Sequence, residues 1–122
     1  MWFGGMIKGE REAVLLERAG VEEKGYNWVE AARLYEEAAK SFLDKKMVEE
    51  AAGAYKKLGY AYARAAGTAE TAEQYVEQNK RAVEAYKEAA NLFQQTGKRP
   101  EELECEAEAS YFSGSVAGSV ME

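Results

Sequence analysis

Ala31-Ala-Arg-Leu-Tyr35-Glu-Glu-Ala-Ala39 carries a nine-residue pattern that recurs at 51–59 and at 82–90. In each copy an alanine is followed four positions later by a tyrosine, then by two charged residues, and a small residue occupies the ninth position. On a helix the small residues flank the tyrosine on one face, so a neighbouring backbone can approach and the ring fills the space beside it. A packing unit that recurs in this way predicts an array of helical hairpins, each burying its face on the next.

The spacing of apolar residues extends this array to five helices. Apolar side chains recur every three or four residues, and no segment alternates convincingly with the period of two that marks a strand. The sequence therefore predicts an all-α fold, and connections of about 2–4 residues favour antiparallel neighbours. The expected helices span 7–24, 27–43, 45–66, 69–96 and 100–120.

The fourth expected helix is the longest, at roughly 42 Å for a rise of 1.5 Å per residue. We expect it to project beyond its neighbours, to kink, or to pack on another chain. Asn79 lies in the middle of its apolar stripe. This residue is either a solvated or hydrogen-bonded interruption, or a device that sets the register of a helix–helix interface.

Polar and small residues predict where the helices begin and end. Gly25 is placed to end the first helix with a positive φ, and Asn27 is predicted to open a capping box for the second. Asp44 is predicted to cap the third helix, and Thr68 or Thr71 the fourth.

Composition and charge exclude several classes of function. The net charge of −6 argues against a nucleic-acid partner, because duplex nucleic acid is bound by basic surfaces. Without histidine, and with a single cysteine, the chain cannot form a Ser-His-Asp triad, a histidine metal site or a thiolate zinc site. We therefore expect no enzymatic activity and no cofactor.

The length of 122 residues predicts one domain, 1–122, with a flexible apolar segment at 1–6. No apolar run reaches the ~18–20 residues needed to span a bilayer. A cytoplasmic location is the default expectation, and a single thiol is compatible with it.

The chain also resembles a known repeat family. Tyr55-Lys-Lys-Leu-Gly-Tyr-Ala-Tyr62 is similar to the first helix of a tetratricopeptide repeat, and Ala82, Tyr86 and Ala89 are similar to residues of its second helix. Residues 28–112 most resemble the irregular repeats of soluble NSF attachment proteins. The resemblance implies stacked antiparallel hairpins in a right-handed superhelix that serves as a non-enzymatic scaffold for protein binding.

A lysine cluster and one tyrosine are candidates for contacts with a partner protein. The lysines follow the end of the second expected helix, and Tyr60 lies off the apolar stripe of the third. The lysines either contact a partner or form a solvated face. Tyr60 is either an exposed contact or a ring lying over a neighbouring helix. The lysine candidates are Lys45, Lys46, Lys56 and Lys57.

The N-terminal segment supplies a second candidate, because four large apolar residues there adjoin a glycine-containing stem. We expect these side chains either to contact a membrane interface or to cover the end of the array or a second chain. They are Trp2, Phe3, Met6 and Ile7.

We expect a scaffold that binds a peptide or a helical segment of another protein. One alternative is a self-assembling bundle, in which the fourth helix and the small-residue face of the fifth, at Gly114 and Gly118, form a homodimer. The other is a peripheral membrane adaptor that uses Trp2 and Phe3. Cys105 lies on the apolar stripe of the fifth helix, where a small buried hydrophobe is expected.

Overall fold

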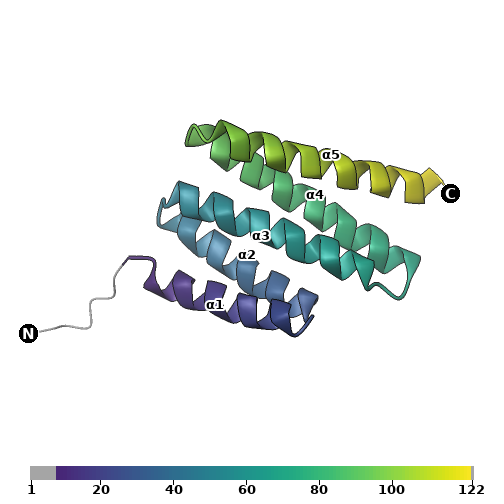
Figure 1. The fold of residues 1–122 in the computed structure, drawn as a ribbon, viewed down its shortest axis with the longest axis horizontal. Helices are drawn as coiled ribbons and strands as arrows, with labels where there is room; N and C mark the ends of the chain where they lie inside the picture. The colour runs from purple at the N-terminus through teal and green to yellow at the C-terminus, as the bar shows by residue number, and fades with distance from the viewer. Residues whose placement is uncertain (1–7, 122) are drawn as a thin grey trace, which may run out of the picture.

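The computed structural model describes residues 8–121, with side chains described from 8 to 114. Within this part the fold is all-α, as predicted, and it contains no strand. Figure 1 shows the helices side by side in chain order, with the connecting turns at alternating ends. The helices are α1 (Glu10–Lys24), α2 (Trp28–Asp44), α3 (Val48–Gly67), α4 (Ala72–Gln95) and α5 (Arg99–Met121).

The recurring nine-residue pattern supplies the contacts between neighbouring helices. In the first and third copies the leading alanine, the tyrosine and the closing alanine are all buried. In the middle copy Ala51 and Gly59 are buried, whereas Tyr55 is partly buried and packs against both hydrophobic clusters of the structure. Burial of these faces between helices accounts for the all-helical stack.

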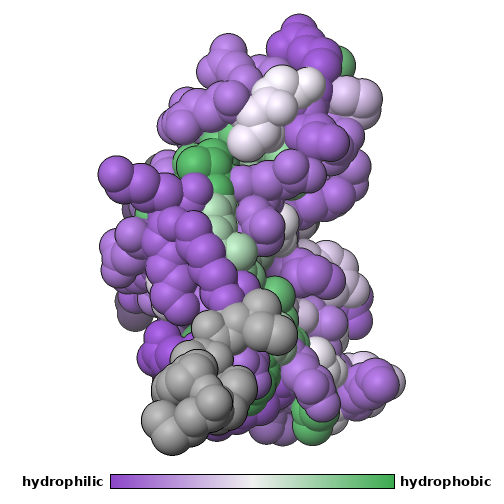
Figure 2. All heavy atoms as spheres, turned by 90° about the vertical axis from the view of Figure 1, so that its left-hand side faces the viewer, coloured by the Kyte–Doolittle hydropathy of each residue, from purple (hydrophilic) through white to green (hydrophobic). Residues whose placement is uncertain are grey.

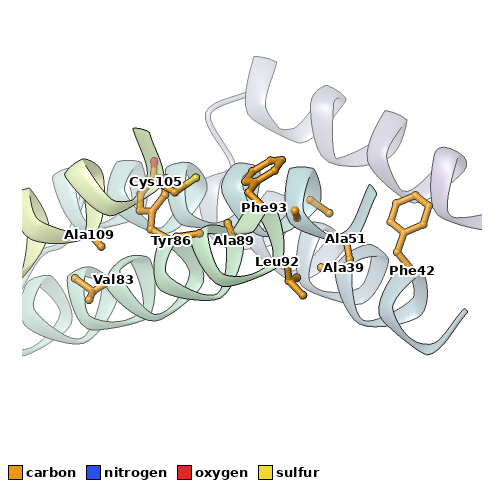
Figure 3. Packing of buried hydrophobic residues seen from close by; sticks show 13 residues of the cluster. Ala39, Phe42, Ala51, Val83, Tyr86, Ala89, Leu92, Phe93, Cys105 and Ala109 are labelled. Atoms are coloured by element: carbon orange, nitrogen blue, oxygen red, sulfur yellow. The ribbon is translucent and has the colours of Figure 1, made fainter. Parts of the chain in front are cut away.

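One of these clusters extends across four helices. Figure 3 shows it running from Phe42 on α2 through Phe93 on α4 to Cys105 on α5, which confirms the expected burial of that cysteine. Outside the clusters the surface is mostly polar. On the face turned toward the viewer in Figure 2, hydrophobic residues form a narrow band between hydrophilic ones.

Gly59 allows a close approach between α3 and α4. A Cβ added at this position would lie 2.8 Å from Cδ2 of Tyr86 and 2.9 Å from two further atoms of the ring. The Tyr86 ring is buried and stacks on Phe112 of α5, with 6.1 Å between ring centroids and 2° between planes. One aromatic ring therefore sets the spacing of three consecutive helices.

Three of the four turns share one backbone geometry. In each, a residue with positive φ follows the helix, and the next amide donates to a carbonyl in the last turn of that helix. This arrangement satisfies carbonyl groups that a helix end leaves without partners. The positive-φ residues are Tyr26 (62°), Lys46 (62°) and Gly97 (74°).

Three predictions about the turns are wrong. Gly25 ends α1 as predicted, but it has a φ of −88° instead of a positive one, and its neighbour Tyr26 takes the left-handed conformation. Asn27 makes no side-chain cap to α2, and its Nδ2 donates to Glu22 Oε2 at 3.3 Å. Asp44 is the last residue of α2 and does not cap α3. Both turns are closed by backbone hydrogen bonds, and neither Asn27 nor Asp44 caps the following helix with its side chain.

The start of α4 follows one of the two predicted caps. Thr71 Oγ1 accepts from the Gln74 amide at 3.1 Å, and Gln74 Oε1 accepts from the Glu70 amide at 3.0 Å. The fourth helix, α4, has 24 residues and α5 has 23. It is therefore the longest described helix, as expected, but it is only one residue longer than α5. Asn79 is only 2% exposed, which excludes the solvated interruption and leaves the buried alternatives open.

Candidate functional site

A groove of about 740 Å³ lies between α3 and α5, and we call it the α3–α5 groove. Its two α4 residues are buried, so they form its base. The lining residues are Glu23 of α1; Gly53, Lys56, Lys57, Tyr60, Ala63 and Arg64 of α3; Tyr86 and Phe93 of α4; and Glu104, Glu108 and Phe112 of α5.

The α3 residues of the groove follow helical spacing. Gly53, Lys57, Tyr60 and Arg64 are three or four positions apart, which places them in one row along the helix. A Cβ added at Gly53 would meet no atom within 4 Å outside its own turn of helix. The groove is therefore open at the Gly53 end of the row, where another molecule can approach the α3 backbone.

Aromatic rings form the apolar part of the groove. Tyr86 stacks on Phe112, and Phe112 meets the exposed Tyr111 edge to face at 5.0 Å. Burial raises the pKa of Tyr86, and the nearby Glu108 carboxylate adds to the shift. The Tyr86 hydroxyl is protonated at neutral pH even at the ordinary pKa of a tyrosine, so it can donate a hydrogen bond.

The two rims of the groove carry opposite charges. Lys56 Nζ lies 2.8 Å from Glu104 Oε1 and so links α3 to α5. Both side chains are partly exposed, so this ion pair contributes at most about 1 kcal/mol. Lys57 is exposed and forms no ion pair among residues 8–114. It leaves a positive charge on the α3 rim that a partner can use.

Tyr60 is exposed and also lies over a neighbouring helix, while its contact with a partner stays a prediction. Its ring meets the buried Trp28 of α2 edge to face, with 5.9 Å between centroids, and so lies over a neighbouring helix. It is also 47% exposed and lines the groove. The Arg64 guanidinium lies 5.0 Å from the centroid of the Trp28 ring. Trp28 thus holds two groove residues in place, through an aromatic contact and a cation–π contact.

Lys45 lies outside the groove and stabilises the fold through an ion pair with a buried glutamate. Its Nζ is 2.7 Å from Oε2 of Glu12, and Ser41 Oγ donates to the same carboxylate. Glu12 is completely buried, and the bonds from Lys45 and Ser41 lower its pKa from 4.5 to about 2. Lys45 therefore neutralises a buried carboxylate that joins α1 to the α2–α3 turn.

The predicted lysine cluster thus divides into two parts. Lys46 takes the positive-φ position of the α2–α3 turn beside Lys45 and does not line the groove. Lys56 and Lys57 do line it, together with Tyr60. The surface that combines lysine and tyrosine candidates is therefore the middle of α3, and not the turn.

The sequence interpretation misses other residues of the groove. Arg64 lies four positions after Tyr60 on the same row, so helical spacing could have found it. Glu104 and Phe112 belong to α5, and no local spacing relates them to α3. Only the packing of α3, α4 and α5 brings these groups to one surface.

Trp2, Phe3, Met6 and Ile7 lie outside the described residues, so the membrane-contact hypothesis stays a prediction. No helix in residues 8–121 combines the length and the apolar character needed to cross a membrane. In the described part of the chain, no group of three or more His, Cys, Asp or Glu side chains is placed to hold a metal ion. Comparisons with protein-family models, with curated proteins and with solved structures give no match for this chain.

Proposed function

We propose that this chain is a non-enzymatic, tetratricopeptide-like scaffold of antiparallel helical hairpins in the cytoplasm. Its partner is a peptide or a helical segment of another protein, bound in the α3–α5 groove. The observation that supports this function is the meeting of a cationic rim, a half-exposed tyrosine and a stacked aromatic pair in one groove of about 740 Å³.

The chemistry of the groove suits a protein segment. Tyr60 and Phe112 offer aromatic surface, and aromatic residues and arginine carry much of the binding energy at protein interfaces. Lys57 and Arg64 on the α3 rim favour an acidic group in the partner, while Glu108 on the α5 rim favours a basic group. A partner with both charges would bind in one orientation, because the reverse orientation opposes like charges.

The test is selection of peptides from a displayed random library on the purified protein, followed by measurement of their affinity. The groove variant is Lys57→Glu with Tyr60→Ala. The matched control is Lys40→Glu with Val21→Ala, which reverses one lysine charge and shortens one apolar side chain at exposed positions outside the groove. We expect the groove variant to raise the dissociation constant at least about tenfold and the control to leave it within about twofold. Equal affinity of both variants would contradict the assignment of the groove.

A homodimer is the second candidate, and exposed apolar side chains on α5 favour it. Leu103 is 45% exposed and Tyr111 is 69% exposed. Light scattering separates the two functions. A monomer that binds selected peptides supports the scaffold, and a dimer whose mass does not change with concentration supports self-assembly.

A further inference from the structure

One ion pair crosses the α3–α5 groove from rim to rim. Lys56 Nζ of α3 lies 2.8 Å from Glu104 Oε1 of α5, and both residues line the groove. The floor between these two helices is formed by Tyr86 and Phe93 of α4, whose side chains are buried. The ion pair therefore passes over α4 as a bridge, and we call it the Lys56–Glu104 bridge.

This bridge lies in the path of a bound protein segment. Lys56 is three positions after Gly53 and four positions before Tyr60, and all three residues line the groove. On a helix, residues at these separations follow one another along the surface. A segment that contacts both the open backbone at Gly53 and the ring of Tyr60 meets the bridge between them. It reaches the floor of the groove once one of the two bridging side chains has moved.

The fold holds α5 in place without this bridge. Cys105 of α5 is completely buried in a hydrophobic cluster that includes residues of α4. Lys98 Nζ, in the α4–α5 turn, lies 3.6 Å from Glu49 Oε1 of α3 and adds a further link. The side chains of Lys56 and Glu104 are 35% and 55% exposed, and ion pairs with this exposure are weak. The bridge can therefore open while α5 stays packed on α4.

We infer, on the basis of the proposed function, that Glu104 of the free protein occupies the place that a carboxylate of the partner takes in the complex. The observed ligand of Lys56 in this groove is a carboxylate. A partner segment without an acidic group gives up the ion pair and puts nothing in its place. An aspartate or glutamate of the partner restores a charge-assisted bond to Lys56. The neighbouring Lys57, which forms no ion pair among residues 8–114, adds to the attraction.

Glu104 is thus an internal competitor of the partner, and it sets the preference of the groove for an acidic segment. Its displacement costs only what a half-exposed ion pair contributes, which corresponds to a factor of up to about five in the dissociation constant. Glutamine at position 104 removes the competing charge and leaves Lys56 free. The Glu104→Gln variant should therefore bind an acidic segment more tightly than the unchanged protein does.

The test uses the peptides selected on the purified protein, together with analogues in which asparagine replaces aspartate and glutamine replaces glutamate. Fluorescence anisotropy at physiological ionic strength gives the dissociation constants. The bridge variant is Glu104→Gln. The matched control is Glu106→Gln, which removes the same charge from an exposed position two residues further along α5 and outside the groove. Urea unfolding followed by circular dichroism confirms that both variants fold.

We expect the selected peptides to contain an acidic residue and to bind Glu104→Gln about three to five times more tightly than the unchanged protein. The Glu106→Gln control should change the dissociation constant less than about 1.5-fold, because screening weakens the effect of a charge outside the groove. The uncharged analogues should show no gain with Glu104→Gln. The Lys56→Met variant should lose much of the preference for the acidic peptide over its analogue.

Unchanged or weaker binding by Glu104→Gln would give the bridge a structural role alone and overturn the inference. An equal gain in the Glu106→Gln control would show a general effect of charge and overturn it as well, as would selected peptides that contain no acidic residue. Peptides that bind in the groove but show none of the expected gain would leave the proposed function intact. Failure to select any groove-binding peptide would contradict the proposed function itself, so the two failures are distinguishable.

Discussion

Alanine at Gly59 should destabilise the protein, whereas alanine at Gly53 in the same helix should stabilise it. Both substitutions gain about 1 kcal/mol of helix propensity, because alanine replaces glycine in a helix interior. They differ in what the new methyl group meets. At Gly53 it meets no atom within 4 Å, and at Gly59 it lies 2.8 Å from the ring of Tyr86.

The size of the effect follows from the confinement of that ring. Carbon atoms pack at about 3.5–4 Å, so the ring must retreat by roughly 1 Å. Tyr86 is buried and stacked on Phe112, which blocks such a movement. Overpacking of this kind costs about 1–3 kcal/mol. The Gly59→Ala variant should therefore be about 2 kcal/mol less stable than the Gly53→Ala variant, with helix propensity cancelled between them.

Urea unfolding followed by circular dichroism measures this difference. In thermal unfolding it corresponds to a gap of about 8 °C between the two midpoints for a domain of this size. A double-mutant cycle with Tyr86→Leu adds a control, because the penalty at Gly59 should largely vanish once the ring is removed. Equal stability of the two alanine variants would refute the claim that the Gly59–Tyr86 contact sets the helix spacing.

Three further predictions concern buried and strained residues. The bonds to Glu12 stabilise its charged form, so the stability that they supply is present above pH 4.5 and is lost as the pH falls toward about 2. With a discount for the exposure of Lys45, these bonds contribute about 2 kcal/mol to the free energy of unfolding. The Glu12→Gln variant should therefore lose about 2 kcal/mol less stability on acidification than the unchanged protein. Equal losses of stability on acidification in the two proteins would contradict this role of Glu12. Lys46→Gly should raise the free energy of unfolding by about 0.5–1 kcal/mol in urea titrations, because glycine takes a positive φ without strain; a loss of stability would count against this. Burial raises the pKa of Cys105 to about 11, so the thiol of the folded protein is protonated and covered at neutral pH. The fraction of Cys105 labelled by a thiol reagent should therefore rise with urea in parallel with the unfolded fraction. Rapid labelling of the native protein would contradict this prediction.

The helices could be predicted from sequence because their signal is local. The alanines and tyrosines of the nine-residue pattern recur at the helical period, and all of them except the partly buried Tyr55 are buried in the structure. The turns could not be predicted as well. At the α1–α2 turn the sequence predicts a side-chain cap at Asn27, whereas the structure closes the turn with backbone hydrogen bonds to carbonyls at the end of α1 and with Tyr26 in the left-handed conformation.

Only some residues of the candidate site could be predicted from the sequence. The sequence points to Lys57 through the lysine cluster and to Tyr60 through its place off the apolar stripe, and the structure shows that both line the same groove. Lys45 belongs to the fold because Glu12, 33 positions earlier, lies buried beside it. Glu12 does fall on the apolar stripe of α1 with Leu15 and Ala19, so a buried carboxylate could have been suspected, but its partner could not have been named.

The most direct measurement is the map of amide chemical-shift changes when a selected peptide binds the ¹⁵N-labelled protein. The groove between α3 and α5 predicts changes at Gly53, Lys57 and Tyr60 and at Phe112 across the groove. Changes confined to α2 or to the α1–α2 turn would place the binding surface elsewhere and contradict the proposed function.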